Sequence, residues 1–374
     1  MHVLIIGAGL GGLCLAQGLR KAGIKATVFE RDPTPQHRGQ GHRVHIDDRG
    51  EHALRSCLPD ELFNLYRATR GQPETMKLFS AAGEHLTELP PPLTPDGGTM
   101  IRDGWSVSRF TLREIMLRGG DIRFGRRFTH YAEEGGQVVA HFADGTTATG
   151  DLLVGADGIG SAVRKQKLPH AQVIDTGVRW IAGKTPVTPE LKATLPPSLV
   201  SGIAGVTGMD PAMIIGYMLF DRQPVSLGLK EPGDYLLWAI LTSKERVDDS
   251  AHFLPGHRLH AMALDLARTV HPDLRAAVEQ AWPEQCFHLT MGTAVPVDPW
   301  ETTRVTLLGD AVHAMPPARG SGANTALADA AALAAALAEG TPLAEYEDDL
   351  RERGFAMVRA SADAMEQAKA YLPG

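Results

Sequence analysis

Cysteine is scarce in this sequence, and its scarcity excludes two classes of protein. The chain has three cysteines, Cys14, Cys57 and Cys286, an odd number without CxxC spacing. A disulfide framework and a zinc cage are therefore not expected. We predict a cytoplasmic protein that has no metal site.

Long apolar runs and an excess of positive charge are also missing. The run from Val3 to Ile6 stops after four residues, where glycines begin, and this is too short for a signal peptide or a membrane span. The net charge is −7 and the pI is about 6.1. Neither nucleic acid nor a membrane is therefore expected as a partner.

The chain does have enough apolar material for two domains. Its 374 residues exceed one typical domain. Hydrophobic residues make up 43% and charged residues 22%, as in ordinary globular proteins.

The first informative segment has the pattern of a dinucleotide site. Val3 to Ile6 is predicted to be a buried strand, and Gly7, Gly9 and Gly12 follow as GxGxxG before a helical pattern. Glu30 ends the next predicted strand, 18 residues after Gly12 (30 minus 12). A carboxylate there suits the ribose diol of FAD or NAD and would repel the 2′-phosphate of NADP. The alternative is a glycine-rich turn in an ordinary α/β protein.

A second segment, Gly155-Ala-Asp157-Gly158, closes another short predicted strand. Ser161 suits a helix N-cap, and Arg164 lies in the first turn after it. The pattern predicts strand, tight turn and helix. A surface turn in which Arg164 pairs with Asp157 is the alternative.

The third segment starts at Gly309-Asp310 and leads into an Ala/Leu-rich helix predicted from about 325 to 338. Asp310 can accept a hydrogen bond from a polyol such as the ribityl chain of a flavin. Pro317 fixes the loop, and Gly320 and Gly322 let bare backbone reach a flat ring. The free amides predicted to face the pyrimidine edge of a flavin are those of Gly322, Ala323 and Asn324. The alternative is that this helix only packs in the core.

With all three segments in order, the chain resembles the single-component (group A) FAD-dependent aromatic monooxygenases, which include para-hydroxybenzoate hydroxylase and the tetracycline-inactivating monooxygenases. The resemblance implies an α/β fold: a Rossmann-like FAD-binding domain, a second domain on a mostly antiparallel sheet, and a long C-terminal helix. The predicted FAD-binding domain is 1–75, 100–168 and 290–374, and the predicted substrate-binding domain is 76–99 and 169–289.

Further site residues follow from the resemblance. Arg109 matches an arginine that reaches the flavin or its phosphates, whereas Arg113 is interpreted as a surface charge. The stretch from Glu30 and Arg31 through Arg38 is similar to one that carries a flavin-facing arginine. Arg38 and His45 are the candidates for a role near the reaction; a solvated loop and a structural histidine are their alternatives. No general acid or base is assigned.

The second domain is predicted to supply the substrate pocket. Its expected strands are 178–181, 213–220, 225–229 and 235–241, and 251–282 contains a helical stretch. The candidate substrate contacts are aromatic or large apolar side chains: Trp180, Met213, Ile215, Tyr217 and Trp238. The alternative for each of them is plain core, because aromatic and Met residues dominate buried sheet faces.

The activity implied by the resemblance is hydroxylation of an aromatic or polycyclic small molecule. NAD(P)H reduces the FAD, and O2 then forms a flavin C4a-hydroperoxide that transfers oxygen to the substrate. No two tryptophans are two apart, so the Trp-x-Trp signature of flavin halogenases is missing. A reductase of the geranylgeranyl reductase type and a non-catalytic flavin-binding redox sensor are the alternatives. A monomer or a homodimer is expected.

Overall fold

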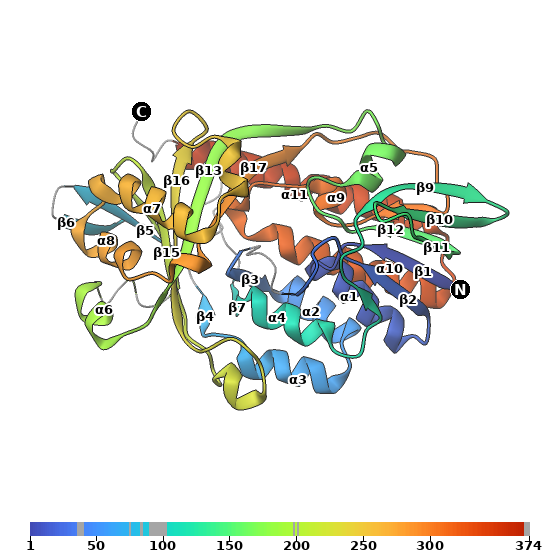
Figure 1. The fold of residues 1–374 in the computed structure, drawn as a ribbon, viewed down its shortest axis with the longest axis horizontal. Coiled ribbons are helices and arrows are strands. Elements are labelled where there is room, and N and C mark those ends of the chain that lie inside the picture. Colours follow the sequence, from blue (N-terminus) through green and yellow to red (C-terminus); the bar gives the residue numbers. More distant parts are fainter. Residues whose placement is uncertain are drawn as a thin grey trace.

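The computed structural model describes residues 1–35, 41–74, 76–82, 85–89, 103–196, 199 and 202–369, and it divides into two halves, each built around a sheet (Figure 1). The first half holds a parallel sheet in the order β18-β12-β1-β2-β8. Its strands are β1 (His2–Ile6), β2 (Lys25–Phe29), β8 (Ile122–Arg123), β12 (Leu152–Gly155) and β18 (Val305–Leu307). Both faces of this sheet are covered, which is why β1 is a continuous apolar run.

Helices cover one face of the parallel sheet. They are α1 (Leu10–Lys21), α2 (Asp48–Cys57), α3 (Asp60–Thr69), α4 (Arg109–Leu117), α10 (Ser321–Glu339) and the long α11 (Leu343–Lys369). Small residues bring α1 and α10 close together, because a Cβ built on Gly18 would lie 2.8 Å from the Cβ of Ala334. The alanine-rich body of α10 is therefore core, as its spacing predicts.

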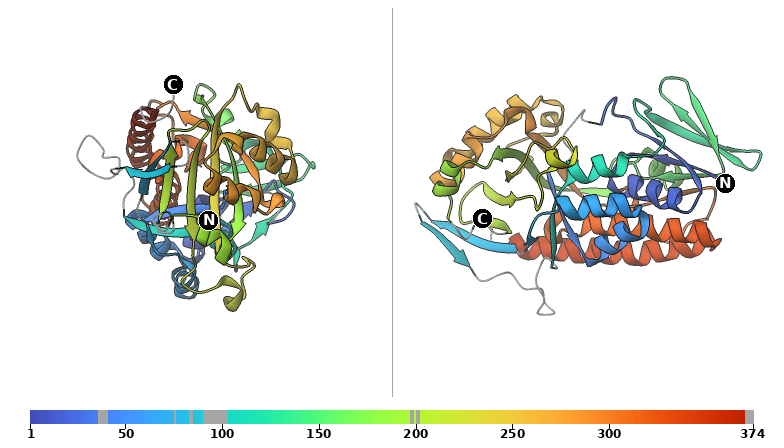
Figure 2. Two further views of the ribbon diagram at one scale, coloured as in Figure 1. Left: turned by 90° about the vertical axis from the view of Figure 1, so that its left-hand side faces the viewer. Right: turned by 90° about the horizontal axis from the view of Figure 1, so that it is seen from below.

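A small antiparallel sheet and a short helix cover the opposite face. The strands are β9 (Phe128–Glu134), β10 (Gln137–Phe142) and β11 (Thr147–Gly150), and the helix is α5 (Ala162–Lys167). Figure 2 shows that the β9–β10 hairpin projects from the end of the molecule where the N-terminus lies.

The second half is built on a seven-stranded sheet, called here the roof sheet, in the order β17-β13-β16-β15-β14-β5-β6. Its strands are β5 (Met76–Ala82), β6 (His85–Leu89), β13 (Val173–Pro186), β14 (Ile203–Thr207), β15 (Ala212–Met218), β16 (Tyr235–Ser243) and β17 (Phe287–Ala294). Every neighbouring pair is antiparallel except β14 and β5. The mostly antiparallel second sheet is thus confirmed.

Helices α6 (Pro189–Thr194), α7 (Gly256–Leu266) and α8 (Pro272–Glu279) lie on the outer side of the roof sheet, at the left in Figure 1. They form with it a hydrophobic core separate from that of the parallel sheet. The predicted strand at 225–229 is wrong. Pro224–Leu227 is a 3-10 helix that ends at Gly228, whose φ of 72° is left-handed and unsuited to a strand.

Three short strands connect the two halves: β3 (Arg43–Asp47), β4 (Pro73–Glu74) and β7 (Gly104–Ser108), in the order β3-β7-β4. The remaining helix is α9 (Asp310–His313), directly after β18. None of the helices in the described ranges is both long enough and apolar enough to cross a bilayer.

Candidate flavin and substrate site

A cavity of about 1250 Å³ lies between the parallel sheet and the roof sheet. Its wall is formed by the glycine-rich loop after β1, by the segments after β12 and β18, and by the roof sheet. Typical ligand pockets have about 300–1,000 Å³. The cavity is therefore large enough for more than one small molecule.

The glycine-rich loop presents bare backbone to this cavity. Gly9 is the N-cap of α1 and has an extended backbone, and a Cβ built on it would meet none of the described protein within 4 Å. The first amides of α1 have no acceptor within the helix, so they offer an anion site at its positive end.

The other two glycines of GxGxxG serve the fold. Gly7 has a φ of 107°, and its Cβ would lie 2.4 Å from the carbonyl oxygen of Ala156. A Cβ on Gly12 would lie 2.2 Å from the carbonyl oxygen of Gly7, and Gly12 does not line the cavity among the described residues. Its role is the close approach of helix to strand.

Glu30 and Arg113 hold the loop from two sides. Glu30 is buried at the end of β2, and its Oε2 accepts from the N–H of Ala8 at 2.9 Å. Arg113 Nε donates to the carbonyl of Ala8 at 2.9 Å and its Nη1 to that of Pro35 at 2.6 Å. The interpretation of Arg113 as a surface charge is wrong, because only 8% of it is exposed.

In the second segment, the side chains of Asp157 and Ser161 both accept hydrogen bonds from N–H groups in the first turn of α5. Asp157 Oδ2 accepts from the N–H of Ala162 at 2.8 Å, and Ser161 Oγ accepts from that of Arg164 at 2.9 Å. Burial raises the pKa of Asp157, although these hydrogen bonds oppose the rise. The predicted N-cap at Ser161 is confirmed.

Arg164 joins the second segment to the third. It is buried, and its guanidinium donates to the carbonyls of Ile159 and Ala311, both at 2.9 Å. A surface pair between Arg164 and Asp157, the alternative reading of this segment, is therefore not what the structure has.

The turn of the third segment is fixed by a buried carboxylate. Asp329 Oδ2 accepts from the N–H of Gly309 at 3.0 Å and lies 2.5 Å from Nε2 of His313, while Oδ1 accepts from Arg353. Burial opposes a charge on His313, but Asp329 outweighs it, so the pKa of His313 is raised.

Asp310 follows that turn and reaches the cavity. Its side chain is exposed to the cavity, and desolvation by the surrounding protein raises its pKa, opposed by the charges of His313 and Arg109. Once a ligand fills the cavity and displaces water, this carboxylate needs hydrogen-bond donors from that ligand.

Helix α10 begins earlier than predicted, at Ser321 with Gly320 as its N-cap. The amides without an acceptor in the helix are thus those of Ser321, Gly322 and Ala323. The carbonyl of Gly320 accepts from Nδ2 of Asn324 at 3.0 Å, and contact of the Asn324 amide with the flavin stays a prediction.

The Asn324 side chain is fully buried and does not belong to the described cavity wall. Its Oδ1 accepts from the N–H of Asp47, and its Nδ2 donates to the carbonyl of His45. Asn324 therefore connects the start of α10 to β3.

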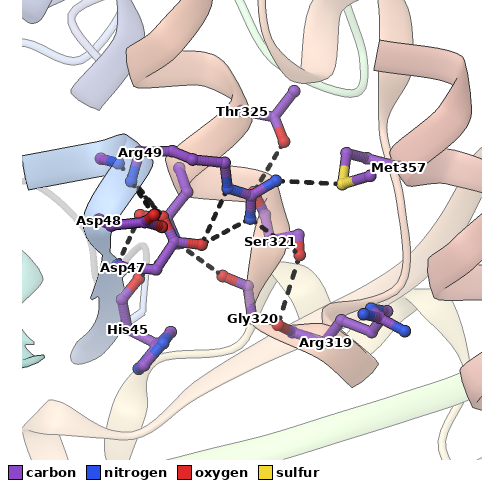
Figure 3. A network of polar contacts seen from close by, with 11 residues as sticks. His45, Asp47, Asp48, Arg49, Arg319, Gly320, Ser321, Thr325 and Met357 are labelled. Atoms are coloured by element: carbon purple, nitrogen blue, oxygen red, sulfur yellow. Dashed lines mark hydrogen bonds and ion pairs between the residues drawn. The ribbon is translucent and has the colours of Figure 1, made fainter. Parts of the chain in front are cut away.

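Figure 3 shows a second set of contacts that holds the start of α10. Arg49 Nε donates to Asp47 Oδ2 at 3.0 Å, Nη1 contacts Sδ of Met357 at 3.1 Å, and Nη2 reaches Ser321 Oγ at 3.5 Å. Thr325 Oγ1 donates to the carbonyl of Ser321. The first turn of α10 is thereby fixed between α2 and α11.

The roof sheet turns an apolar face to the cavity. Trp180 lies opposite Leu241 and Leu289, and Ala212 lies opposite Leu241 in the next pair, so these residues share one face. The large apolar residues of this sheet that line the cavity include Met76, Leu78, Trp180, Ile203, Ile214, Leu237, Leu241 and Leu289.

Three of the five predicted substrate contacts lie on the wrong face. Ile215, Tyr217 and Trp238 belong to the core beneath α7 and α8, and Trp238 Nε1 donates to Thr185 there. Both faces of the roof sheet are buried, so apolar alternation could not identify the cavity face. Trp180 does line the cavity. Met213 belongs to the core beneath the helices and also forms part of the cavity lining.

The remaining predicted residues are placed as follows. Arg31, His45, Arg109 and Pro317 line the cavity, and a Cβ built on Gly320 would lie 3.3 Å from that of His45. Arg38 lies outside the described residues. Arg43, which belongs to none of the three sequence motifs, also lines the cavity and donates to Ser106 Oγ.

The cavity wall fits FAD. Along it, the glycines Gly9, Gly158 and Gly160 leave space in which a Cβ would meet nothing of the described protein within 4 Å, and at Gly322 the nearest atom would be 3.8 Å away. This bare backbone, an anion-binding helix start and an open carboxylate match the pyrophosphate and polyol of the cofactor. The described residues contain no group of three or more His, Cys, Asp or Glu that could hold a metal ion.

Known proteins share this arrangement. The family described as FAD binding domain matches residues 1–182 and 264–361. The chain is 33% identical to the FAD-dependent monooxygenase dbaB of Emericella nidulans over 89% of this chain and 86% of that protein. A candidate FAD-containing monooxygenase from Photorhabdus luminescens has a similar solved structure, with a TM-score of 0.79 and 30% identity over 100% of this chain and 98% of that one.

A longer relative is the dual O-methyltransferase/FAD-dependent monooxygenase elcB of Phaeosphaeria nodorum. It is 36% identical over 95% of this chain, and the match spans 42% of the relative's own length. The family match and the relative matched along most of its length agree with the site geometry. The chain therefore belongs to the family of FAD-dependent monooxygenases.

Proposed function

We propose that this protein uses NAD(P)H and O2 to hydroxylate an aromatic or polycyclic small molecule. The observation that carries the proposal is a single cavity lined by the glycine-rich loop, by Asp310 and by the apolar face of the roof sheet. A nucleotide-binding wall and an apolar wall in one space suit a cofactor and an apolar substrate together.

Each part of the nucleotide wall has a specific task in this proposal. Glu30 accepts from the ribose hydroxyls, the first amides of α1 bind the pyrophosphate, and Asp310 accepts from the ribityl chain. The free amides at the start of α10, beginning at Ser321, stabilise negative charge on the pyrimidine edge of the ring. When bound, FAD supplies electrons from NAD(P)H for the activation of O2.

The roof sheet positions the substrate and excludes water. Trp180, Ile214 and Leu241 present flat or branched apolar surface, which favours a planar, largely neutral ring system. Exclusion of water prevents loss of oxidising equivalents to side reactions.

The long relative suggests the substrate class. The name of elcB gives it two activities, that of an O-methyltransferase and that of an FAD-dependent monooxygenase. O-methylation needs a hydroxyl group. A hydroxyl also makes an aromatic ring electron-rich, as hydroxylation requires. We therefore propose a phenolic substrate.

The test is oxidation of NADPH and NADH in the presence of polycyclic phenols and, as matched controls, their O-methyl ethers. The proposal predicts that some phenols stimulate oxidation and yield a hydroxylated product, and that their ethers do so less. FAD-loaded protein that consumes neither nicotinamide cofactor with any phenol would contradict it and would favour a flavin-binding sensor.

A further inference from the structure

A buried carboxylate connects the roof sheet to the segment that carries Arg109. Glu231 lies in the loop before β16, and its Oε1 accepts from Lys184 Nζ of β13 at 2.8 Å. Its Oε2 accepts from Ser108 Oγ, at the end of β7, at 2.8 Å. One side chain thus holds a strand of the roof sheet and the residue that begins α4.

These groups are isolated from water. The side chains of Lys184 and Glu231 are 4% and 3% exposed, and Ser108 is fully buried. Burial lowers the pKa of Lys184, and the neighbouring charge of Glu231 opposes this. Removal of one partner would leave an uncompensated buried charge, so the two must stay together.

A second contact between the halves acts on the same place. The carbonyl of His42 accepts from Tyr235 Oη of β16 at 2.8 Å and from the N–H of Arg109 at 2.9 Å. The ring of His42 also contacts the carbonyl of Gln285, through Nε2 at 2.7 Å. The backbone of Arg109 is therefore held on one side by Ser108 and on the other by a carbonyl that the roof sheet fixes.

Arg109 is the first residue of α4, with Ser108 as N-cap. Its side chain lines the cavity and its charge acts on Asp310. Neither Ser108, Lys184 nor Glu231 belongs to the cavity wall in the described part of the chain. Any effect of these three residues on the cofactor must pass through a neighbour.

We propose that Lys184, Glu231 and Ser108 form a latch between the two halves, here called the Glu231 latch, which positions Arg109 against the cofactor. Affinity for FAD then depends on Lys184 and Glu231, two side chains in the half built on the roof sheet that do not touch FAD. The inference rests on the proposed FAD site and not on the oxygenase activity, because its test measures cofactor binding alone.

The test is a double-mutant cycle with the dissociation constant for FAD as the readout. Lys184→Met/Glu231→Leu replaces the buried ion pair by apolar side chains of similar size, which favours retention of the fold, but Ser108 loses its acceptor. We expect affinity for FAD to fall about tenfold when Arg109 is present, the size of effect of one charge-assisted hydrogen bond. In an Arg109→Ala background the same change should cost less than about twofold, because coupled residues are not additive.

Two further variants separate positioning from general stability. Lys184→Met/Glu231→Gln returns a carbonyl acceptor to Ser108 and should bring affinity for FAD back toward that of wild type. The matched control is the pair Lys167 and Glu347, whose side chains are also 4% and 3% exposed. The Glu347 carboxylate likewise accepts from a hydroxyl group, here that of Thr306. Lys167→Met/Glu347→Leu should leave affinity for FAD unchanged.

Three results would overturn the latch. They are equal loss of affinity with and without Arg109, equal loss in the matched control, and unchanged affinity in Lys184→Met/Glu231→Leu. Should that variant not fold, Ser108→Ala enters the same cycle, since it removes the hydrogen bond to Glu231 together with the bond from the Thr111 N–H that caps α4. If the wild-type protein bound no FAD at all, the proposed FAD site itself would fail, which is distinguishable from failure of the latch.

Discussion

The substitution Gly9→Ala separates the requirements of the fold from those of the cofactor. Gly9 has φ −76° and ψ 179°, a conformation that alanine adopts without strain. The added methyl would meet none of the described protein within 4 Å. The free energy of unfolding of the cofactor-free protein should therefore be unchanged or rise by up to about 1 kcal/mol, because alanine reduces the entropy of the unfolded chain.

Binding of FAD should respond in the opposite direction. The methyl projects from the loop where the pyrophosphate approaches the start of α1, and overpacking of this kind costs about 1–3 kcal/mol. That range corresponds to a dissociation constant about 5- to 150-fold higher. Titration of the apoprotein with FAD and chemical unfolding of the same apoprotein measure the two quantities.

Gly12→Ala is the matched control for Gly9→Ala. Its methyl would lie 2.2 Å from the carbonyl oxygen of Gly7, so helix and strand must separate and the apoprotein should lose about 3 kcal/mol of stability. The reasoning is refuted if Gly9→Ala binds FAD as tightly as wild type, or if it unfolds as readily as Gly12→Ala.

Three further predictions concern single side chains. Asp310→Ala should purify with most of its FAD missing, because an enclosed polyol loses its acceptor at a cost of about 1–3 kcal/mol; full occupancy would exclude that role. Ile214→Ala should raise KM for the substrate with little change in stability, whereas Trp238→Ala should cost about 3–5 kcal/mol of stability. Thermal unfolding and steady-state kinetics measure the two effects. The reverse outcome would exclude the assignment of Ile214 to the cavity face of the roof sheet and of Trp238 to its helix-covered face. Asp329 raises the pKa of His313 above 6.5 despite burial, so the pair stabilises the fold fully below about pH 6.5 and its contribution is lost as the pH rises through the raised pKa. The stability difference between wild type and His313→Gln should accordingly narrow at alkaline pH, and a difference that widens would refute the assignment.

The nucleotide end could be predicted from the sequence because its chemistry is local. The spacing of Gly7, Gly9 and Gly12 predicts a single tight turn between strand and helix. Glu30 directly follows the adjacent strand. These residues lie close together through neighbouring parallel strands, so short-range spacing is sufficient.

The roof sheet could be predicted only in part, because its chemistry depends on which face is covered. Ile214 and Ile215 are equally apolar, and only the cavity on one side and the helices on the other distinguish them. The strand expected at 225–229 failed because Pro224 and Gly228 outweighed its apolar pattern.

Contacts between residues far apart in the chain could not be predicted from the sequence either. Arg113 reaches a carbonyl 105 residues away in the glycine-rich loop, and Glu231 reaches Ser108 across 123 residues. A charged residue on a predicted helix or loop is most often solvated. No local pattern identifies the few that are buried against a distant partner.

The decisive measurement for the proposed monooxygenase activity is the origin of the oxygen in the product. A polycyclic phenol that stimulates NAD(P)H oxidation is incubated with the FAD-loaded enzyme under isotopically labelled O2, and the product is examined by mass spectrometry. We expect the new hydroxyl to carry the label from O2 and none from labelled water. A product that is reduced or dehydrogenated, or whose oxygen comes from water, would contradict it.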